Sequence, residues 1–141
     1  MIDREKIKTK IRIIQENLEE LEKFKNLSLE ELKNSKRDLA AAKYFLRTAI
    51  EAMIDIGSHI VAKKLLGVPN TNVEVIQILS EKGILTRENA PTFIKMVKYR
   101  NRLTHFYQEV SPEEIFDIIQ NKLSDFKKYI SEILTYLRTE I

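Results

Sequence analysis

The chain of 141 residues contains no cysteine and no tryptophan, and it has only three glycines and three prolines. Because cysteine is absent, the sequence excludes a disulfide framework, a thiolate zinc site and a cysteine nucleophile. So few glycines and prolines leave little material for tight turns, and no segment alternates for long between apolar and polar residues. The sequence therefore predicts an all-α fold.

Long apolar runs are also missing, and we expect no apolar leader. No apolar stretch approaches the roughly 20 residues that a helix needs to cross a bilayer. Residues 1–6 are mostly charged, whereas a secretion signal has an apolar region. The length is that of one domain, covering residues 1–141. We expect a single-domain cytoplasmic protein with no membrane attachment.

Known patterns for metal sites and phosphate loops are absent as well. The chain has no glycine-rich phosphate loop, no pair of histidines at metal-ligand spacing and no Ser-His-Asp order. Glu113 and Glu114 directly follow Ser111 and Pro112, a pattern that marks the start of a helix. We interpret both carboxylates as first-turn residues and expect neither a metal nor a cofactor.

Apolar residues recur at helical spacing along most of the chain. Residues Ile7, Ile11, Ile14, Leu18 and Leu21 form one stripe, which we expect to pack into the bundle. Capping residues and glycines divide the rest. We predict helices over residues 7–26, 29–66 with a restart or bend at 34–35, 72–82, 86–108 or 89–108, and 112–137. This pattern predicts an antiparallel bundle of four long helices and one short helix.

The clearest functional signal is a basic segment. Residues 89–108 contain no acidic residue, but they include Lys95, Lys98, Arg100, Arg102 and His105. The net charge of the whole chain is only +3, so the excess of cations is local, as in a phosphate-binding patch. Arginine offers a planar charged fork for phosphate oxygens, and the ordinary pKa of histidine suits proton transfer near neutral pH.

Helix geometry separates the two most chemically useful residues of this segment. Arg100 and His105 are five residues apart, which places them about 140° from each other around a straight helix. Asn101 shares the face of His105, and Arg102 lies beside it. One helix cannot easily direct both Arg100 and His105 at one phosphate, whereas two copies related by a two-fold axis can. The spacing therefore predicts a homodimer with a shared site.

The order Arg100, four residues, His105, one residue, Tyr107, with Asn101 after the arginine, resembles the signature of HepT-like toxins of the HEPN superfamily. Residues 50–60 and 79–85 resemble the helical segments that precede this signature in the family, and the likeness begins near Asp38. The resemblance implies a HEPN-like helical homodimer that acts as a metal-independent endoribonuclease and toxin. It also implies an RNA substrate and a minimal nucleotidyltransferase antitoxin as partner.

The resemblance also implies roles for single residues. Arg100 binds the scissile phosphate, and His105 acts as general acid or base while a ribose 2′-hydroxyl attacks. Tyr107 matches the tyrosine to which the antitoxin attaches adenylate. Asn101, Arg102 and Asp55 are expected to support the site or contact RNA, with Asp55 orienting the arginine or the histidine.

Plainer interpretations of the same residues remain open. His105 can be a cation that stabilises a helix end, and Tyr107 can be a core ring with its hydroxyl at the rim. We interpret His59, on an apolar helix, as structural. The alternative function is a non-catalytic HEPN module that binds nucleotides or holds a nucleotidyltransferase. Arg100 and His105 together favour cleavage, because binding alone needs no proton-transfer group.

Overall fold

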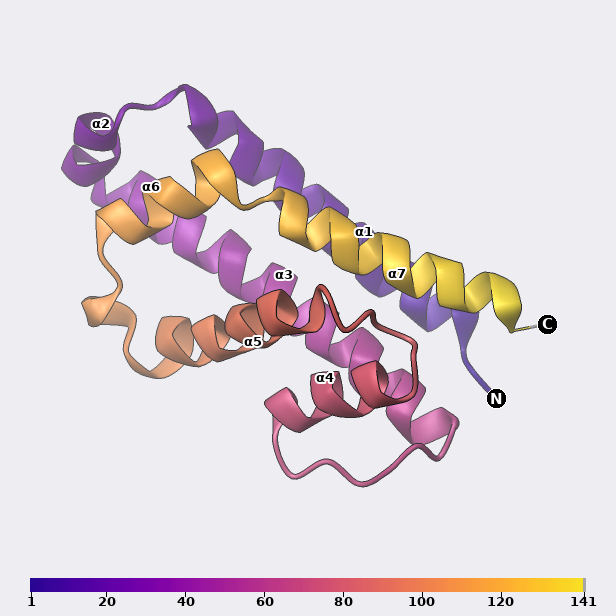
Figure 1. The fold of residues 1–141 in the computed structure, drawn as a ribbon. Helices are drawn as coiled ribbons and strands as arrows, with labels where there is room; N and C mark the ends of the chain where they lie inside the picture. Colours follow the sequence, from indigo (N-terminus) through magenta and orange to yellow (C-terminus); the bar gives the residue numbers. More distant parts are fainter. Residues whose placement is uncertain (141) are drawn as a thin grey trace.

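The computed structural model describes residues 1–140, which fold into helices joined by short connections (Figure 1). The α-helices in this part of the chain are α1 (Arg4–Lys23), α2 (Leu29–Asn34), α3 (Lys36–Lys63), α4 (Asn72–Glu81), α5 (Ala90–His105), α6 (Pro112–Asn121) and α7 (Ser124–Thr139). Two 3-10 helices, η1 (Phe24–Asn26) and η2 (Tyr107–Glu109), lie between them. The predicted all-α fold is confirmed.

Most helices begin where the sequence supplies a capping residue. Capping boxes form at Ser28, Thr71 and Ser111, where the side chain of the cap and that of the glutamate three residues on each accept a backbone hydrogen bond. Ser35 caps α3 by accepting from the amide of Asp38. This cap separates α2 from α3, so the predicted restart at residues 34–35 is confirmed.

The last predicted helix, residues 112–137, is divided into α6 and α7. Lys122 leaves helical geometry at φ −126° and ψ 3°, and Leu123 is buried at the junction. The division follows from packing, because α6 lies against α2 and α3, whereas α7 packs against α5. One straight helix could not follow both surfaces and still bury both sets of apolar residues.

Helix α3 runs through the middle of the bundle and contacts α1, α4, α5 and α6 (Figure 1). The predicted apolar stripe of α1 is buried in the bundle, largely against α3, as expected. Tyr129 of α7 is fully buried, and its hydroxyl donates to the carbonyl of Met53 at 2.8 Å. Its ring meets that of Phe93 on α5 edge to face, with centroids 5.1 Å apart. These contacts join α3, α5 and α7 in one core.

His59 has the structural role that we expected for it. Its ring is buried, and Nε2 accepts a hydrogen bond from the backbone amide of Asp3, the cap of α1, at 2.9 Å. Burial lowers the pKa of His59, and the nearby ammonium groups of Lys6 and Lys63 lower it further. The neutral ring therefore joins the start of α1 to the end of α3.

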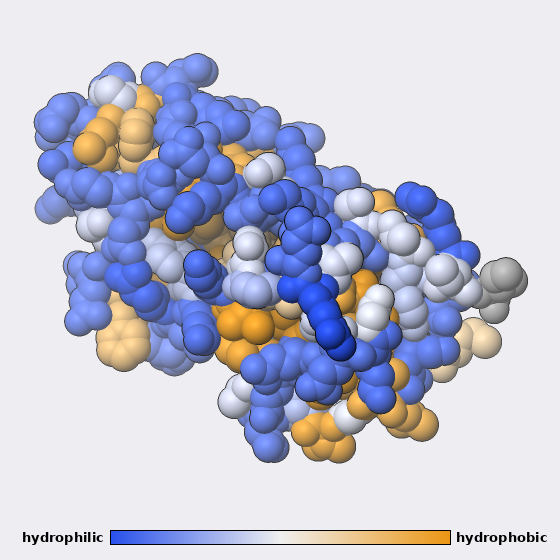
Figure 2. Space-filling model, in the orientation of Figure 1, coloured by the Kyte–Doolittle hydropathy of each residue, from blue (hydrophilic) through white to orange (hydrophobic). Residues whose placement is uncertain are grey.

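Within residues 1–140, no helix combines the length and the apolar character that crossing a membrane requires. Most of the face shown in Figure 2 is hydrophilic, and apolar surface interrupts it in places.

Candidate functional site

Helix α5 holds the basic segment against the bundle by its apolar residues. Phe93, Val97 and Leu103 are buried, and Pro91 occupies the first turn, where its missing N–H costs little. The cationic residues that alternate with them face the edges of the helix or solvent. The helix remains regular to its last residue, His105.

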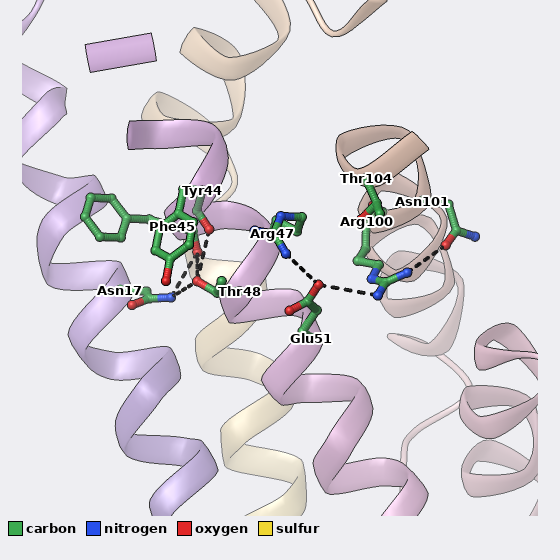
Figure 3. A network of polar contacts seen from close by, with 9 residues as sticks. All are labelled: Asn17, Tyr44, Phe45, Arg47, Thr48, Glu51, Arg100, Asn101 and Thr104. Carbon is green, nitrogen blue, oxygen red and sulfur yellow. Dashed lines mark hydrogen bonds and ion pairs between the residues drawn. The ribbon is translucent and has the colours of Figure 1, made fainter. Parts of the chain in front are cut away.

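Arg100 lies on the edge of α5 that faces α3, where Glu51 forms ion pairs with two arginines (Figure 3). Oε1 of Glu51 is 2.9 Å from Nη1 of Arg47, one turn earlier on α3, and 3.4 Å from Nη2 of Arg100. Nη1 of Arg100 also reaches the side-chain oxygen of Asn101 at 3.5 Å. Nε of Arg100 is enclosed and has no hydrogen-bond partner among residues 1–140. Glu51 thus fixes the direction of two guanidinium groups at one place.

His105 is exposed and occupies the last turn of α5. Because α5 is regular between the two residues, the separation of about 140° around the axis applies to this protein. Arg100 turns towards α3, whereas His105 and Asn101 face solvent. Within one chain, the structure does not bring Arg100 and His105 to a common face. Each side chain separately has the chemistry that phosphodiester cleavage requires.

Tyr107 lies outside α5, so the predicted extension of this helix to residue 108 is wrong. The helix ends because Phe106 adopts φ −128° and ψ 39°, and Tyr107 begins η2. Nζ of Lys43 donates to the carbonyl oxygen of Tyr107 at 3.1 Å and lies 4.2 Å from the centre of its ring. The Tyr107 side chain is exposed, which contradicts its interpretation as a core ring.

Lys43 contacts Tyr107, a neighbour that the sequence did not predict. It is buried on α3, and burial lowers the pKa of its ammonium group. Its contacts with the carbonyl oxygen and the ring of Tyr107 hold η2 against α3. The sequence does hold one sign of this role. Lys43 interrupts the apolar residues around Ala42 and Leu46, and a cation at such a position needs a polar partner.

Within the chain, Asp55 contacts neither Arg100 nor His105, and Arg102 is held by a glutamate of α6. The exposed carboxylate of Asp55 pairs with Lys10 of α1 at 2.9 Å, and Glu51, one turn earlier, contacts Arg100 in its place. Both Nη atoms of Arg102 bind the carboxylate of Glu114, with Nη2 at 3.2 Å. Arg102 therefore joins the end of α5 to the start of α6.

Glu113 and Glu114 are confirmed as first-turn residues of α6. The hydrogen bond from Arg102 holds the pKa of Glu114 below its usual value, and bonds from Ser111 lower it further. Among residues 1–140, no group of three or more histidine, aspartate or glutamate side chains is arranged to hold a metal ion.

The family model described as "Ribonuclease HepT-like" matches residues 14–133. The chain belongs to the HepT-like ribonuclease family. The resemblance to HepT-like toxins of the HEPN superfamily is confirmed, and with it the expected enzyme class, an endoribonuclease.

Curated relatives of this HepT-like chain are nucleases. The "tRNA nuclease HepT" of Aphanizomenon flos-aquae is 33% identical over 133 residues, which cover 94% of this chain and 90% of the relative. The "mRNA nuclease HepT" of Shewanella oneidensis is 32% identical over 88 residues, which cover 62% of this chain and 66% of that protein. The names of these two relatives thus give different RNA substrates, tRNA for one and mRNA for the other.

Chains from solved toxin–antitoxin complexes share the fold of this HepT-like chain. A tri-AMPylated toxin of Shewanella oneidensis, in complex with an MNT antitoxin, superposes with a TM-score of 0.84 at 26% identity, covering 96% of this chain and 99% of that one. A chain of a toxin–antitoxin structure with AMP-PNP gives a TM-score of 0.86 at 24% identity, covering 93% of this chain and 98% of that one. At this level of identity, the second comparison shows a shared fold only.

Proposed function

We propose that this protein is the toxin of a toxin–antitoxin pair, and that it cleaves RNA without a metal at a site shared across a homodimer. The observation that carries the proposal is the pair formed by Arg100 and His105 on a regular α5, which places a phosphate-binding fork and a proton-transfer group on different faces. Family membership supports the nuclease activity.

In the proposed reaction, Arg100 of one protomer binds the scissile phosphate and offsets the negative charge that develops on it. His105 of the other protomer takes the proton of the ribose 2′-hydroxyl, whose oxygen attacks the phosphorus atom. The bond from phosphorus to the 5′-oxygen breaks, and that oxygen receives a proton. The products are a 2′,3′-cyclic phosphate and a 5′-hydroxyl.

Cleavage should persist in a chelator, because Arg100 supplies the positive charge that a metal would otherwise provide. Purified protein incubated with RNA and EDTA should give fragments that end in cyclic phosphate. Arg100→Ala and His105→Ala should each abolish cleavage and leave the circular dichroism spectrum unchanged. Arg12→Ala, which removes an exposed cation of α1 outside the basic segment, is the control and should stay active. Full activity of His105→Ala would reject the proposed role of His105.

Mixing the two inactive variants tests whether the site is shared. In a heterodimer of Arg100→Ala and His105→Ala, a shared site leaves one complete Arg–His pair, whereas a site within one chain leaves none. Random exchange makes half of the dimers mixed with one of two sites intact, so activity should return to about one quarter of the wild-type value. No recovery in a mixture that has exchanged subunits would show that the site is not shared.

We further propose that a minimal nucleotidyltransferase antitoxin inactivates the toxin by attaching adenylate to Tyr107. The exposure of the Tyr107 side chain supports this, as does the AMPylated state of the related toxin in its complex. Added negative charge next to the basic segment would repel the RNA backbone.

The test is mass spectrometry of the toxin after co-expression with such a partner. Additions of adenylate mass should map to Tyr107, and Tyr107→Phe should keep nuclease activity but escape neutralisation. If Tyr107→Phe is still fully neutralised, the partner inhibits by binding alone.

A further inference from the structure

A groove lies between the first half of α3 and the end of α5, beside the Arg100 site. It has a volume of about 460 Å³ and is lined by Ala40, Tyr44, Arg47, Leu103, Thr104 and Tyr107. We call it the Tyr44 groove. Its volume falls in the range of roughly 300–1,000 Å³ that is typical of small-ligand sites.

Exposed aromatic rings gather around the Tyr44 groove. Among residues 1–140, the large exposed aromatic side chains are Tyr44, Phe106 and Tyr107, with exposed fractions of 54%, 55% and 37%. Tyr44 and Tyr107 line the groove itself, and Phe106 directly precedes Tyr107. In Figure 2, apolar surface interrupts the hydrophilic face at the end where α5 passes into η2. Such rings are stacking platforms for unpaired bases.

Two cations of α3 lie close to the rings of Tyr44 and Tyr107. The guanidinium carbon of Arg47 lies 5.5 Å from the centre of the Tyr44 ring, and Nζ of Lys43 lies 4.2 Å from that of Tyr107. Arg47 is held by Glu51 through Nη1 alone, so its outer N–H groups remain for another acceptor. Figure 3 shows Arg47 between Tyr44 and Arg100, with Glu51 linking the two arginines.

We propose that the Tyr44 groove binds one unstacked nucleotide of the RNA substrate, adjacent to the phosphate at Arg100. The base stacks on Tyr44, and its phosphate contacts Arg47, which Glu51 holds in line with Arg100. This inference rests on the proposed ribonuclease function and adds to it a preference for single-stranded RNA. Bases in a duplex are already stacked and cannot enter the groove.

Binding of a short fluorescent single-stranded RNA to the uncleaving His105→Ala protein tests the proposal. Tyr44→Ala in that background should weaken binding roughly 5- to 150-fold, the range that is measured for loss of one base–aromatic stack. Tyr44→Phe keeps the ring and should bind within about twofold of the parent. Binding of a duplex RNA should respond to neither change.

The contact of Arg47 with a phosphate has its own readout. Arg47→Gln should lower the slope of log affinity against log salt by about one, because one fewer counterion is released on binding. Arg12, an exposed arginine of α1, is the matched control, and Arg12→Gln should leave the slope unchanged. An unchanged slope with Arg47→Gln would refute this part of the proposal.

Failure of the groove and failure of the proposed function give different results. If the wild-type protein cleaves RNA and Tyr44→Ala binds as well as Tyr44, the groove is not a nucleotide site and the nuclease function stands. If no RNA is bound or cleaved by any form, the proposed function itself fails. If Tyr44→Ala dissociates the dimer in sedimentation, or loses the antitoxin while RNA affinity is unchanged, the groove is a protein interface and the nucleotide proposal is wrong.

Discussion

Removal of the Glu114 carboxylate should destabilise the connection between α5 and α6. Glu114 accepts from the amide of Ser111 at 3.0 Å as one half of a capping box, and it binds both Nη atoms of Arg102. Loss of the hydrogen bond from the Ser111 amide costs about 1 kcal/mol. Loss of the hydrogen bonds from Arg102 costs about as much again. We therefore expect Glu114→Ala to lower the free energy of unfolding by about 2 kcal/mol, or the melting temperature by roughly 6–8 °C.

Urea denaturation monitored by circular dichroism measures this change, and Glu113→Ala is the matched control. Glu113 occupies the same first turn and pairs with Lys33, but it takes no part in the capping box, so its loss should be clearly smaller. The folded-state pKa of Glu114 is lowered, so its contribution is complete above the ordinary value of 4.5 and is lost as the pH falls through the lowered value. Equal effects of the two substitutions, or a difference between wild type and Glu114→Gln that persists at low pH, would refute this reasoning.

Three further predictions concern residues that hold the bundle and the site together. Because the folded-state pKa of His59 is lowered, stability should be complete above its ordinary value of 6.5 and decrease as the pH falls below it; His59→Gln should remove this dependence in urea titrations, and His105→Gln should not. Gly57→Ala should lower stability by about 1 kcal/mol, because overpacking outweighs the gain in helix propensity, since the new Cβ lies 2.9 Å from a methyl carbon of α4 and 3.1 Å from the Tyr129 hydroxyl; a higher unfolding midpoint would contradict this. Lys43→Met should speed amide hydrogen exchange in residues 107–110 and leave exchange within α5 unchanged, because it releases the carbonyl oxygen of Tyr107; unchanged exchange in that segment would show that Lys43 does not hold η2.

The features that were predictable from the sequence depend on residues close together in the chain. Capping boxes at Ser28, Thr71 and Ser111 form within four residues, so the starts of α2, α4 and α6 could be located. The break at Lys122 could not be predicted, because no glycine or proline marks it and the apolar pattern continues across it. Packing of α6 and α7 against different neighbours causes that break.

The same distinction applies to the site. Arg100 and His105 were identifiable from their spacing and from the family signature, whereas their assembly across a dimer stays a prediction. Glu51 and Asp55 lie four residues apart on one face of α3, and which of them meets Arg100 depends on how α5 slides along α3. The position of α5 along α3 depends on the packing of the whole core, so the residues next to Glu51 and Asp55 in the sequence do not predict it.

The end of α5 at His105 divides the signature between two parts of the chain that differ in local stability. His105 closes a helix of 16 residues, whereas Tyr107 lies in a three-residue 3-10 turn. That turn is held by hydrogen bonds that the backbone amides of Glu109 and Val110 donate, and by the hydrogen bond from Lys43. Local opening of such a turn costs far less free energy than unfolding the helix before it. The proposed modification of Tyr107 would therefore require only this turn to open, and the helices of the bundle would stay folded while it takes place.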